Sequence, residues 1–136
     1  MYQVLFLGCG DLMKTLETAT TKHLKNVHIH LNDKNSLVLA RNILILKVIF
    51  DEDFDPDNKD DLTFLWDLWY NLDWPDSTER RFTQAINGLL GGILPKNVSV
   101  PYGSHLKVLM EVWRGWLSLS LKTHCKSFIE NVHKER

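Results

Sequence analysis

Apolar residues open the chain as a short uninterrupted run. Residues 4–7 are all apolar, as in a central strand of a parallel sheet that helices cover on both faces. The run leads into a glycine turn at residues 8–10 and then into an acid, Asp11, which can cap a following helix. Leucines and an alanine spaced three to five residues apart predict that helix over residues 12–22.

The next segment alternates between apolar and polar side chains, which is typical of a half-buried strand. Val27, Ile29 and Leu31 share one face of the predicted strand, and His28 and His30 share the other.

A long apolar stretch follows this strand. Asn32 and Asp33 end the strand, and either Asn35 or Ser36 is expected to cap a helix over residues 37–50. The length of the stretch favours a buried helix over a strand. A right-handed crossover would make the two strands parallel neighbours.

The second half is acidic at first and then aromatic. Residues 51–61, DEDFDPDNKDD, predict a solvated loop, because like charges and Pro56 oppose regular structure. A metal site is the weaker interpretation, since the spacing of a calcium loop is missing. Helices are then predicted over residues 62–72, from Ser77 or Thr78 to a stop at Gly91-Gly92, and over 104–134, with a possible edge strand at 96–102.

Composition narrows the classes of function. The formal net charge of −1 argues against a nucleic-acid partner, and no apolar run is long enough for a membrane span. The beginning of the chain lacks the features of a signal peptide, so a cytoplasmic location is expected. Cys9 and Cys125 match no metal spacing and are expected to be reduced thiols.

The glycine turn and the acid after the second strand form the principal candidate site. Gly8, Cys9 and Gly10 follow a strand, and Asp33 ends the next one, where an acid can accept hydrogen bonds from ribose hydroxyls. The dinucleotide fingerprint fails at Met13, and what remains resembles the first motifs of S-adenosylmethionine-dependent methyltransferases. The alternative is that these residues only shape a tight turn and a helix start.

Three other features admit chemistry but are better explained by structure. His28 and His30 lie two apart on one strand face, as metal ligands can, but a third ligand is not evident. Cys9 stands near a predicted helix start, yet no partner base can be identified for a nucleophile. The five tryptophans have helical spacing and suit a core, although so small a chain cannot bury all of them. Those left at the surface would suit a protein interface.

Three segments carry a resemblance to a known family. VLFLGCGDL, HLND-x-N-x-x-VLARNILIL and LTFLWDLWYNL resemble a domain of unknown function at the start of MYND zinc-finger proteins. A related version opens the axonemal dynein assembly factors. The resemblance implies a Rossmann-like, methyltransferase-like domain without established catalysis. The motif positions that it covers are Gly8, Gly10, Asp11, Asn32, Asp33, Asn35, Ala40, Arg41 and Asn42. The chain has no cysteine-rich cluster for a zinc finger, so it is expected to be a fragment of such a protein or a stand-alone copy.

The expected fold is α/β, with a partial parallel Rossmann-like sheet and an enlarged helical C-terminal part. The chain is expected to be one domain over residues 1–136: a strand-helix-strand-helix start at 1–50, the acidic loop at 51–61 and a mainly helical part at 62–136. The candidate cofactor-binding residues are Gly8, Cys9, Gly10, Asp11, Asn32 and Asp33, without catalytic or metal residues.

The expected function is a non-catalytic, methyltransferase-like module that binds or assembles proteins, because the strands that would complete a cofactor pocket are replaced by helices. Two alternatives stay open. One is an S-adenosylmethionine-dependent methyltransferase or S-adenosylmethionine-binding protein. The other, implied by the resemblance, is a chaperone-like factor for dynein-arm assembly in the cytoplasm.

Overall fold

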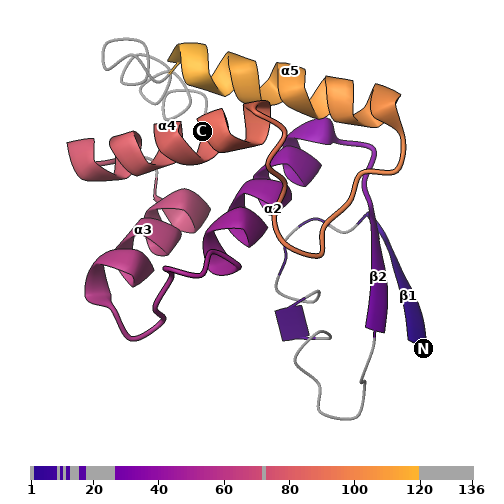
Figure 1. The fold of residues 1–136 in the computed structure, drawn as a ribbon, viewed down its shortest axis with the longest axis horizontal. Helices are drawn as coiled ribbons and strands as arrows, with labels where there is room; N and C mark the ends of the chain where they lie inside the picture. Colours follow the sequence, from indigo (N-terminus) through magenta and orange to yellow (C-terminus); the bar gives the residue numbers. More distant parts are fainter. Residues whose placement is uncertain are drawn as a thin grey trace, which may run out of the picture. The chain divides into compact units, whose positions relative to one another are not determined.

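The protein is described by a computed structural model that covers residues 2–8, 10, 12, 16–17, 27–71 and 73–119 (Figure 1). Within these ranges the fold is mixed α/β, with four helices and a two-stranded parallel sheet. The chain divides into two compact units, Met1–Asn42 and Ile43–Arg136. A single domain over residues 1–136 stays a prediction. The elements are β1 (Tyr2–Leu7), β2 (Val27–Asn32), α2 (Ser36–Ile49), α3 (Lys59–Tyr70), α4 (Asp76–Leu90) and α5 (Gly103–Leu119).

The first unit is built on the pairing of β1 with β2. The strands run parallel over six residue pairs, from Tyr2 opposite Val27 to Leu7 opposite Asn32, which confirms the predicted parallel neighbours. The predicted alternation in β2 is also confirmed, because its apolar positions are half-buried and both histidines are exposed. Parallel strands end at the same edge of a sheet, so the segments that follow Leu7 and Asn32 begin side by side.

The prediction that β1 is buried on both faces is wrong. Val4 and Phe6 are half-buried, but Leu5 and Leu7 are exposed. In the described part of the chain β1 pairs with β2 alone, so the strand alternates like one whose sheet is covered on one face. The rings of His28 and His30 stack on the exposed face, with centroids 4.4 Å apart.

Only part of the helix predicted at residues 12–22 lies within the described residues. Leu12 is buried, and the N–H of Leu16 donates to its carbonyl oxygen at 2.9 Å, as in a helical turn. The other positions of this predicted helix lie outside the described residues.

The apolar stretch after β2 is a helix, as its length predicted. α2 starts where the Asn35 side-chain oxygen accepts the N–H of Leu37 at 3.0 Å, so Asn35 is the capping residue. From Ala40 to Val48 every residue except Arg41 and Lys47 is buried. A helix that is apolar on nearly all sides is expected to be buried in this way.

The loop predicted at the acidic residues 51–61 is shorter than predicted, because α3 begins at Lys59 and not at residue 62. The side chain of Asn58 accepts the N–H groups of Asp60 and Asp61, at 2.9 and 3.1 Å. This cap satisfies two of the backbone donors that a helix start leaves free. The acids in the first turn also stabilise the helix through a favourable interaction with its dipole.

Inside the second unit, α3 and α4 are joined at a corner around the buried carboxylate of Asp67. Thr78 donates its hydroxyl to this carboxylate at 2.7 Å, and the Asn71 amide donates to it at 2.9 Å. The indole N–H of Trp74 donates to the Asp67 backbone carbonyl at 2.9 Å. α3 ends at Tyr70, where the backbone of Asn71 turns extended, and Pro75 is the N-cap residue of α4. α4 then starts at Asp76, before the predicted Ser77 or Thr78.

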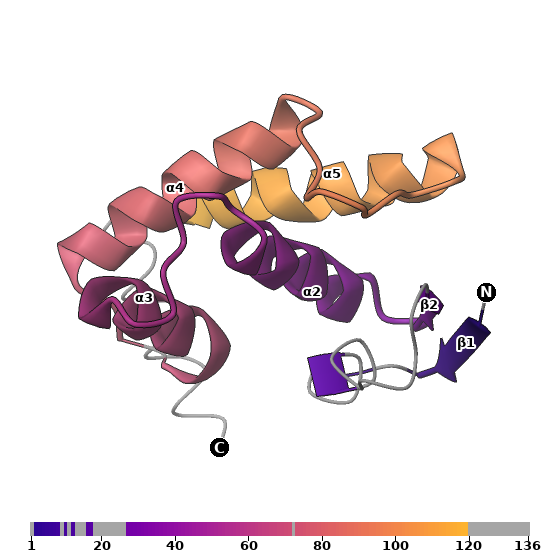
Figure 2. The same cartoon turned by 60° about the horizontal axis from the view of Figure 1, so that its bottom comes forward.

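α4 packs along α5 (Figures 1 and 2). Phe82, Ile86 and Leu89 of α4 are buried, and their spacing of three and four residues places them on one helix face. Trp113 of α5 is fully buried, at 0% exposure. Just after the end of α4, Gly92 has a positive φ of 88°, which glycine adopts without strain.

The predicted edge strand at residues 96–102 is not formed. The N–H of Val98 donates to the Pro95 carbonyl at 3.1 Å and closes a turn, and Asn97 takes a positive φ of 64°. A left-handed residue cannot continue an extended run, so the segment forms a connection to α5. α5 is described as far as Leu119, and the later part of the helix predicted to residue 134 lies outside the described residues.

The two extremes of tryptophan burial give a matched test of this core. Trp113→Ala is expected to lower the free energy of unfolding by about 3–5 kcal/mol, because it leaves a cavity in a packed interior. Trp66, which is 62% exposed, is the control, and its change to alanine should alter stability by about 0.5 kcal/mol or less. Urea denaturation followed by circular dichroism measures both, and equal losses would contradict the described core.

Candidate functional site

The predicted candidate site lies at the edge where β1 and β2 both end. The backbone N–H of Gly10 donates to Oδ2 of Asp33 at 3.2 Å. The structure therefore brings together two predicted residues that are 23 positions apart in the chain. Cys9 and Asp11, which were predicted to belong to the same site, lie outside the described residues.

The second oxygen of the Asp33 carboxylate is also engaged. Oδ1 accepts the N–H of Asn35 at 2.8 Å, just before the first residue of α2. The pKa of the Asp33 carboxyl is held below its ordinary value. The hydrogen bond from Asn35 is the largest cause, the bond from Gly10 is the second, and the charge of Lys34 acts in the same direction. Asp33 is therefore a carboxylate at neutral pH that ties the turn after β1 to the start of α2.

A residue of α2 completes this arrangement. Asn42 is 1% exposed, and its Nδ2 donates to the carbonyl oxygen of Gly10 at 2.8 Å. Gly10 is thus held through its N–H by Asp33 and through its carbonyl by Asn42. The resemblance named Asn42 as a motif position but gave it no role. A buried amide inside an otherwise apolar helix is the signal that could have marked it.

Gly8 lies at the start of the same turn. It is exposed, has a positive φ of 59°, and has no atom of the described residues within 4 Å of the place where a Cβ would stand. Asn32, the last residue of β2, is exposed at the same edge. Neither residue takes part in the hydrogen bonds around Gly10. A ligand could therefore approach the backbone at Gly8, but the Asp33 carboxylate would meet it with both oxygens already accepting a bond.

A second candidate surface lies on α3, within the second unit. Leu62, Trp66 and Tyr70 are 46%, 62% and 56% exposed, although all three are large and apolar or aromatic. The rings of Trp66 and Tyr70 lie 4.8 Å apart, and those of Trp69 and Tyr70 are stacked at 5.8 Å. These side chains border a shallow groove of about 620 Å³, called the α3 groove below. Its described lining residues are Asp57, Lys59, Leu62, Thr63, Leu65, Trp66, Trp69 and Tyr70.

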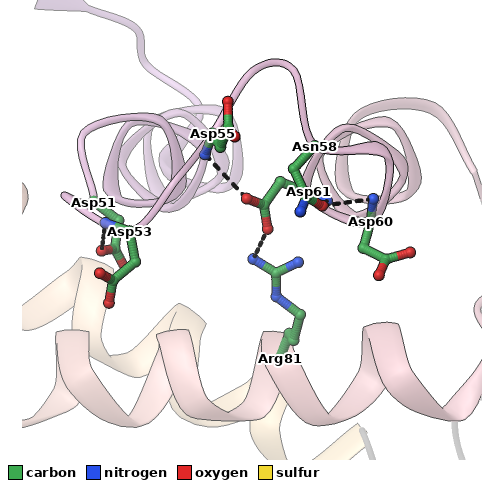
Figure 3. Close-up of polar contacts among 7 residues, drawn as sticks. All are labelled: Asp51, Asp53, Asp55, Asn58, Asp60, Asp61 and Arg81. Carbon is green, nitrogen blue, oxygen red and sulfur yellow. Dashed lines mark hydrogen bonds and ion pairs between the residues drawn. The ribbon is translucent and has the colours of Figure 1, made fainter.

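The acidic segment leads directly into this groove. Residues 51–61 hold seven acids against one lysine, and every one of these acids except Asp61 is exposed. Figure 3 shows Asp61 pointing to Arg81, at 3.0 Å, and also accepting the N–H of Asp55, while the Asp60 carboxylate is turned away. One acid is thus used to join α3 to α4, and most of the remaining charge faces solvent.

The described residues form neither a metal cluster nor a membrane-spanning helix. No three side chains of histidine, cysteine, aspartate or glutamate gather there as a metal ion would require. None of the helices in the described ranges combines the length and apolar character of a membrane span.

Comparison with known proteins identifies a family but no activity. Residues 1–74 match the family described as a domain of unknown function, DUF4470, and the chain belongs to that family. The match contains both strands, α2, the acidic segment and α3. No curated protein and no solved structure gives a significant match.

The role of Asn42 can be tested by removing its amide. Asn42→Ala is expected to lower the free energy of unfolding by about 1–3 kcal/mol, because the Gly10 carbonyl loses its donor in a partly buried place. Asn87→Ala, at an exposed position of α4, is the control and should be near neutral. Thermal unfolding compares the two, and an Asn42 variant as stable as the control would contradict the assigned bond.

The Asp33 carboxylate should make stability depend on pH in acid. A lowered pKa in the folded state means that the stabilisation is complete above the ordinary Asp value of about 3.9 and is lost as the pH falls through the folded value. Asp33→Asn places an amide donor opposite the Gly10 N–H, so this variant should be less stable at neutral pH. Urea denaturation at several pH values should show the difference from wild type shrinking in acid. A difference that is constant down to strong acid would contradict this role.

Proposed function

We propose that this chain is a non-catalytic, methyltransferase-like domain that acts as a protein-binding or assembly module in the cytoplasm. The observation that carries the proposal is the engagement of Asp33. In a nucleotide-binding α/β fold the acid after the second strand accepts hydrogen bonds from ribose hydroxyls. Here Oδ2 accepts the N–H of Gly10 and Oδ1 accepts the N–H of Asn35.

The methyltransferase-like ancestry is supported by the local order of elements. A strand leads into a glycine turn, and a parallel neighbouring strand leads into an acid that contacts that turn. This order of elements is the one expected of a cofactor-binding edge, and here the acid and the buried amide of Asn42 both hold Gly10. We infer that a former binding edge has become a structural one.

The exposed aromatic side chains of α3 support the protein-binding part of the proposal. Trp66 and Tyr70 are both more than half exposed and lie next to one another. Tryptophan and tyrosine are the side chains that most often supply binding energy at protein interfaces. An exposed apolar patch on a helix commonly marks an interaction site.

Binding of S-adenosylmethionine is the second candidate function. It is favoured by the exposure of Gly8, which has no side chain of its own and meets no other described residue at the place of a Cβ. The first hydroxyl of a ribose would have to share an Asp33 oxygen with a backbone N–H, or displace that N–H.

The resemblance to the dynein assembly factors adds a third candidate, a chaperone-like role in the assembly of dynein arms. It rests on the motif around Asn32, Asp33, Arg41 and Asn42, which lies within the matched family region. Purification of the tagged protein from ciliated cells tests it, and the absence of dynein chains and co-chaperones from the bound fraction would count against it.

Calorimetric titration separates a module from a cofactor-binding protein. Neither S-adenosylmethionine nor S-adenosylhomocysteine is expected to bind the wild-type chain with a dissociation constant in the micromolar range. Micromolar binding that is lost in Asp33→Ala, with an unchanged circular dichroism spectrum, would overturn the non-catalytic proposal. A Gly8→Ala variant places a methyl group at this exposed position and should be equally silent.

A further inference from the structure

We infer that the α3 groove is the docking site for a basic, amphipathic peptide segment of a partner protein. The inference rests on the proposed protein-binding function and names the surface and the chemistry of the partner. Two independent features of the described residues carry it: the apolar face that α3 leaves open, and the sign of the charge at one end of that face.

α3 uses one face internally and leaves another exposed. Phe64 and Asp67 are buried, and both take part in contacts with α4, through the Arg81 guanidinium over the Phe64 ring and the Thr78 hydroxyl on Asp67. Positions three and four residues apart share a helix face, so the exposed Leu62, Trp66 and Tyr70 form a second stripe, with the half-buried Trp69 beside it. These residues border the groove of about 620 Å³.

This second stripe has the composition of a binding surface for an apolar anchor. Trp66 and Tyr70 present large rigid rings, and rings of this kind give contact area at little cost in side-chain entropy. An amphipathic helix or extended segment binds such a groove by inserting apolar residues at helical spacing.

The charge around the groove determines the sign of the partner. Asp57 and Lys59 both line the groove, so one charge of each sign stands there. The exposed carboxylates of Asp51, Asp53 and Asp60 belong to the residues that lead into α3 and form its first turn (Figure 3). Lys59 is the single opposing charge among residues 51–61. Such a field favours the approach of lysine and arginine side chains and disfavours acidic ones.

The same charge disfavours the other occupants of an aromatic face. A second copy of the chain docking through this face would bring two acidic segments together, and like charges would oppose the contact. The cytoplasmic surface of a membrane is negative and would also repel the acidic residues beside the groove. A basic segment of another protein meets both requirements, since its apolar side covers the rings and its charged side meets the carboxylates.

A peptide made only of leucine and lysine, with leucines at helical spacing, is the probe. Its binding to the full chain is followed by fluorescence anisotropy of a label on the peptide. Trp66→Ala is expected to weaken binding about tenfold or more, because the most exposed large ring that lines the groove is removed. Tyr102→Ala removes an aromatic side chain that is equally exposed, at 63%, and lies outside the groove, so it should leave binding unchanged.

Charge is tested separately from apolar contact. Asp57→Lys is expected to weaken binding severalfold at low salt, and the effect should shrink as the salt concentration rises. Glu111→Lys, an equal change of charge at an exposed position of α5, should have a smaller effect at every salt concentration. A peptide with glutamate in place of every lysine should bind at least tenfold more weakly than the lysine peptide.

The outcomes distinguish this inference from the broader proposal. Equal binding of the lysine and glutamate peptides, lost in Trp66→Ala, would overturn the basic partner but leave a protein-binding module. Binding of the lysine peptide that Trp66→Ala does not weaken would overturn the groove. Wild-type dimers that dissociate in Trp66→Ala would show that a second copy of the chain occupies the groove. Binding to phosphatidylcholine vesicles that is lost in Trp66→Ala would show that a membrane does. Either result would overturn the inference of a peptide partner. Micromolar binding of S-adenosylmethionine at Asp33 would affect only the proposed function.

Discussion

The double engagement of Gly10 is the constraint on which the first unit depends. Its N–H is bound by the Asp33 carboxylate and its carbonyl by the Asn42 amide. Parallel pairing of β1 and β2 aligns the strands, but these two bonds fix what happens immediately beyond them. They link the end of β1, the end of β2 and the body of α2 through a single residue that has no side chain of its own.

This arrangement explains how residues with the appearance of a ligand site can serve structure. A backbone N–H at the end of a parallel strand can donate a hydrogen bond to a phosphate or a carboxylate. The protein supplies that acceptor itself, from Asp33, and supplies a donor from Asn42 to the neighbouring carbonyl. Both backbone polar groups of Gly10 are therefore satisfied within the unit.

Much of this fold could be predicted from local patterns. The alternation from Val27 to Leu31 predicted β2 and predicted that both histidines lie on the same face of the strand. The apolar length after Asn35 gave α2, and Gly91-Gly92 gave the end of α4. The juxtaposition of Gly10 and Asp33 followed from parallel pairing alone. A Rossmann-like sheet and the single-domain organisation stay predictions.

What could not be predicted depended on contacts between distant residues or on single side chains. Exposure of Leu5 and Leu7 cannot be read from an apolar run, because the run says nothing of how many layers cover the sheet. The early start of α3 depends on Asn58, which reads equally well as part of a loop. The extended run at 96–102 was broken by one residue, Asn97, in a left-handed conformation. Burial of Asn42 depends on a bond to a residue 32 positions earlier.

The corner at Asp67 has a consequence for the order of folding. Asp67 and Thr78 are 11 residues apart, whereas the paired residues of β1 and β2, such as Tyr2 and Val27, are 25 apart. Joining nearer residues costs less loop entropy, and local contacts allow fast folding. The α3–α4 hairpin can thus assemble before the strands have found one another. The Asp67 carboxylate lies in the last turn of α3, where the helix dipole disfavours it, and the hydroxyl of Thr78 offsets this cost by donating a hydrogen bond to it.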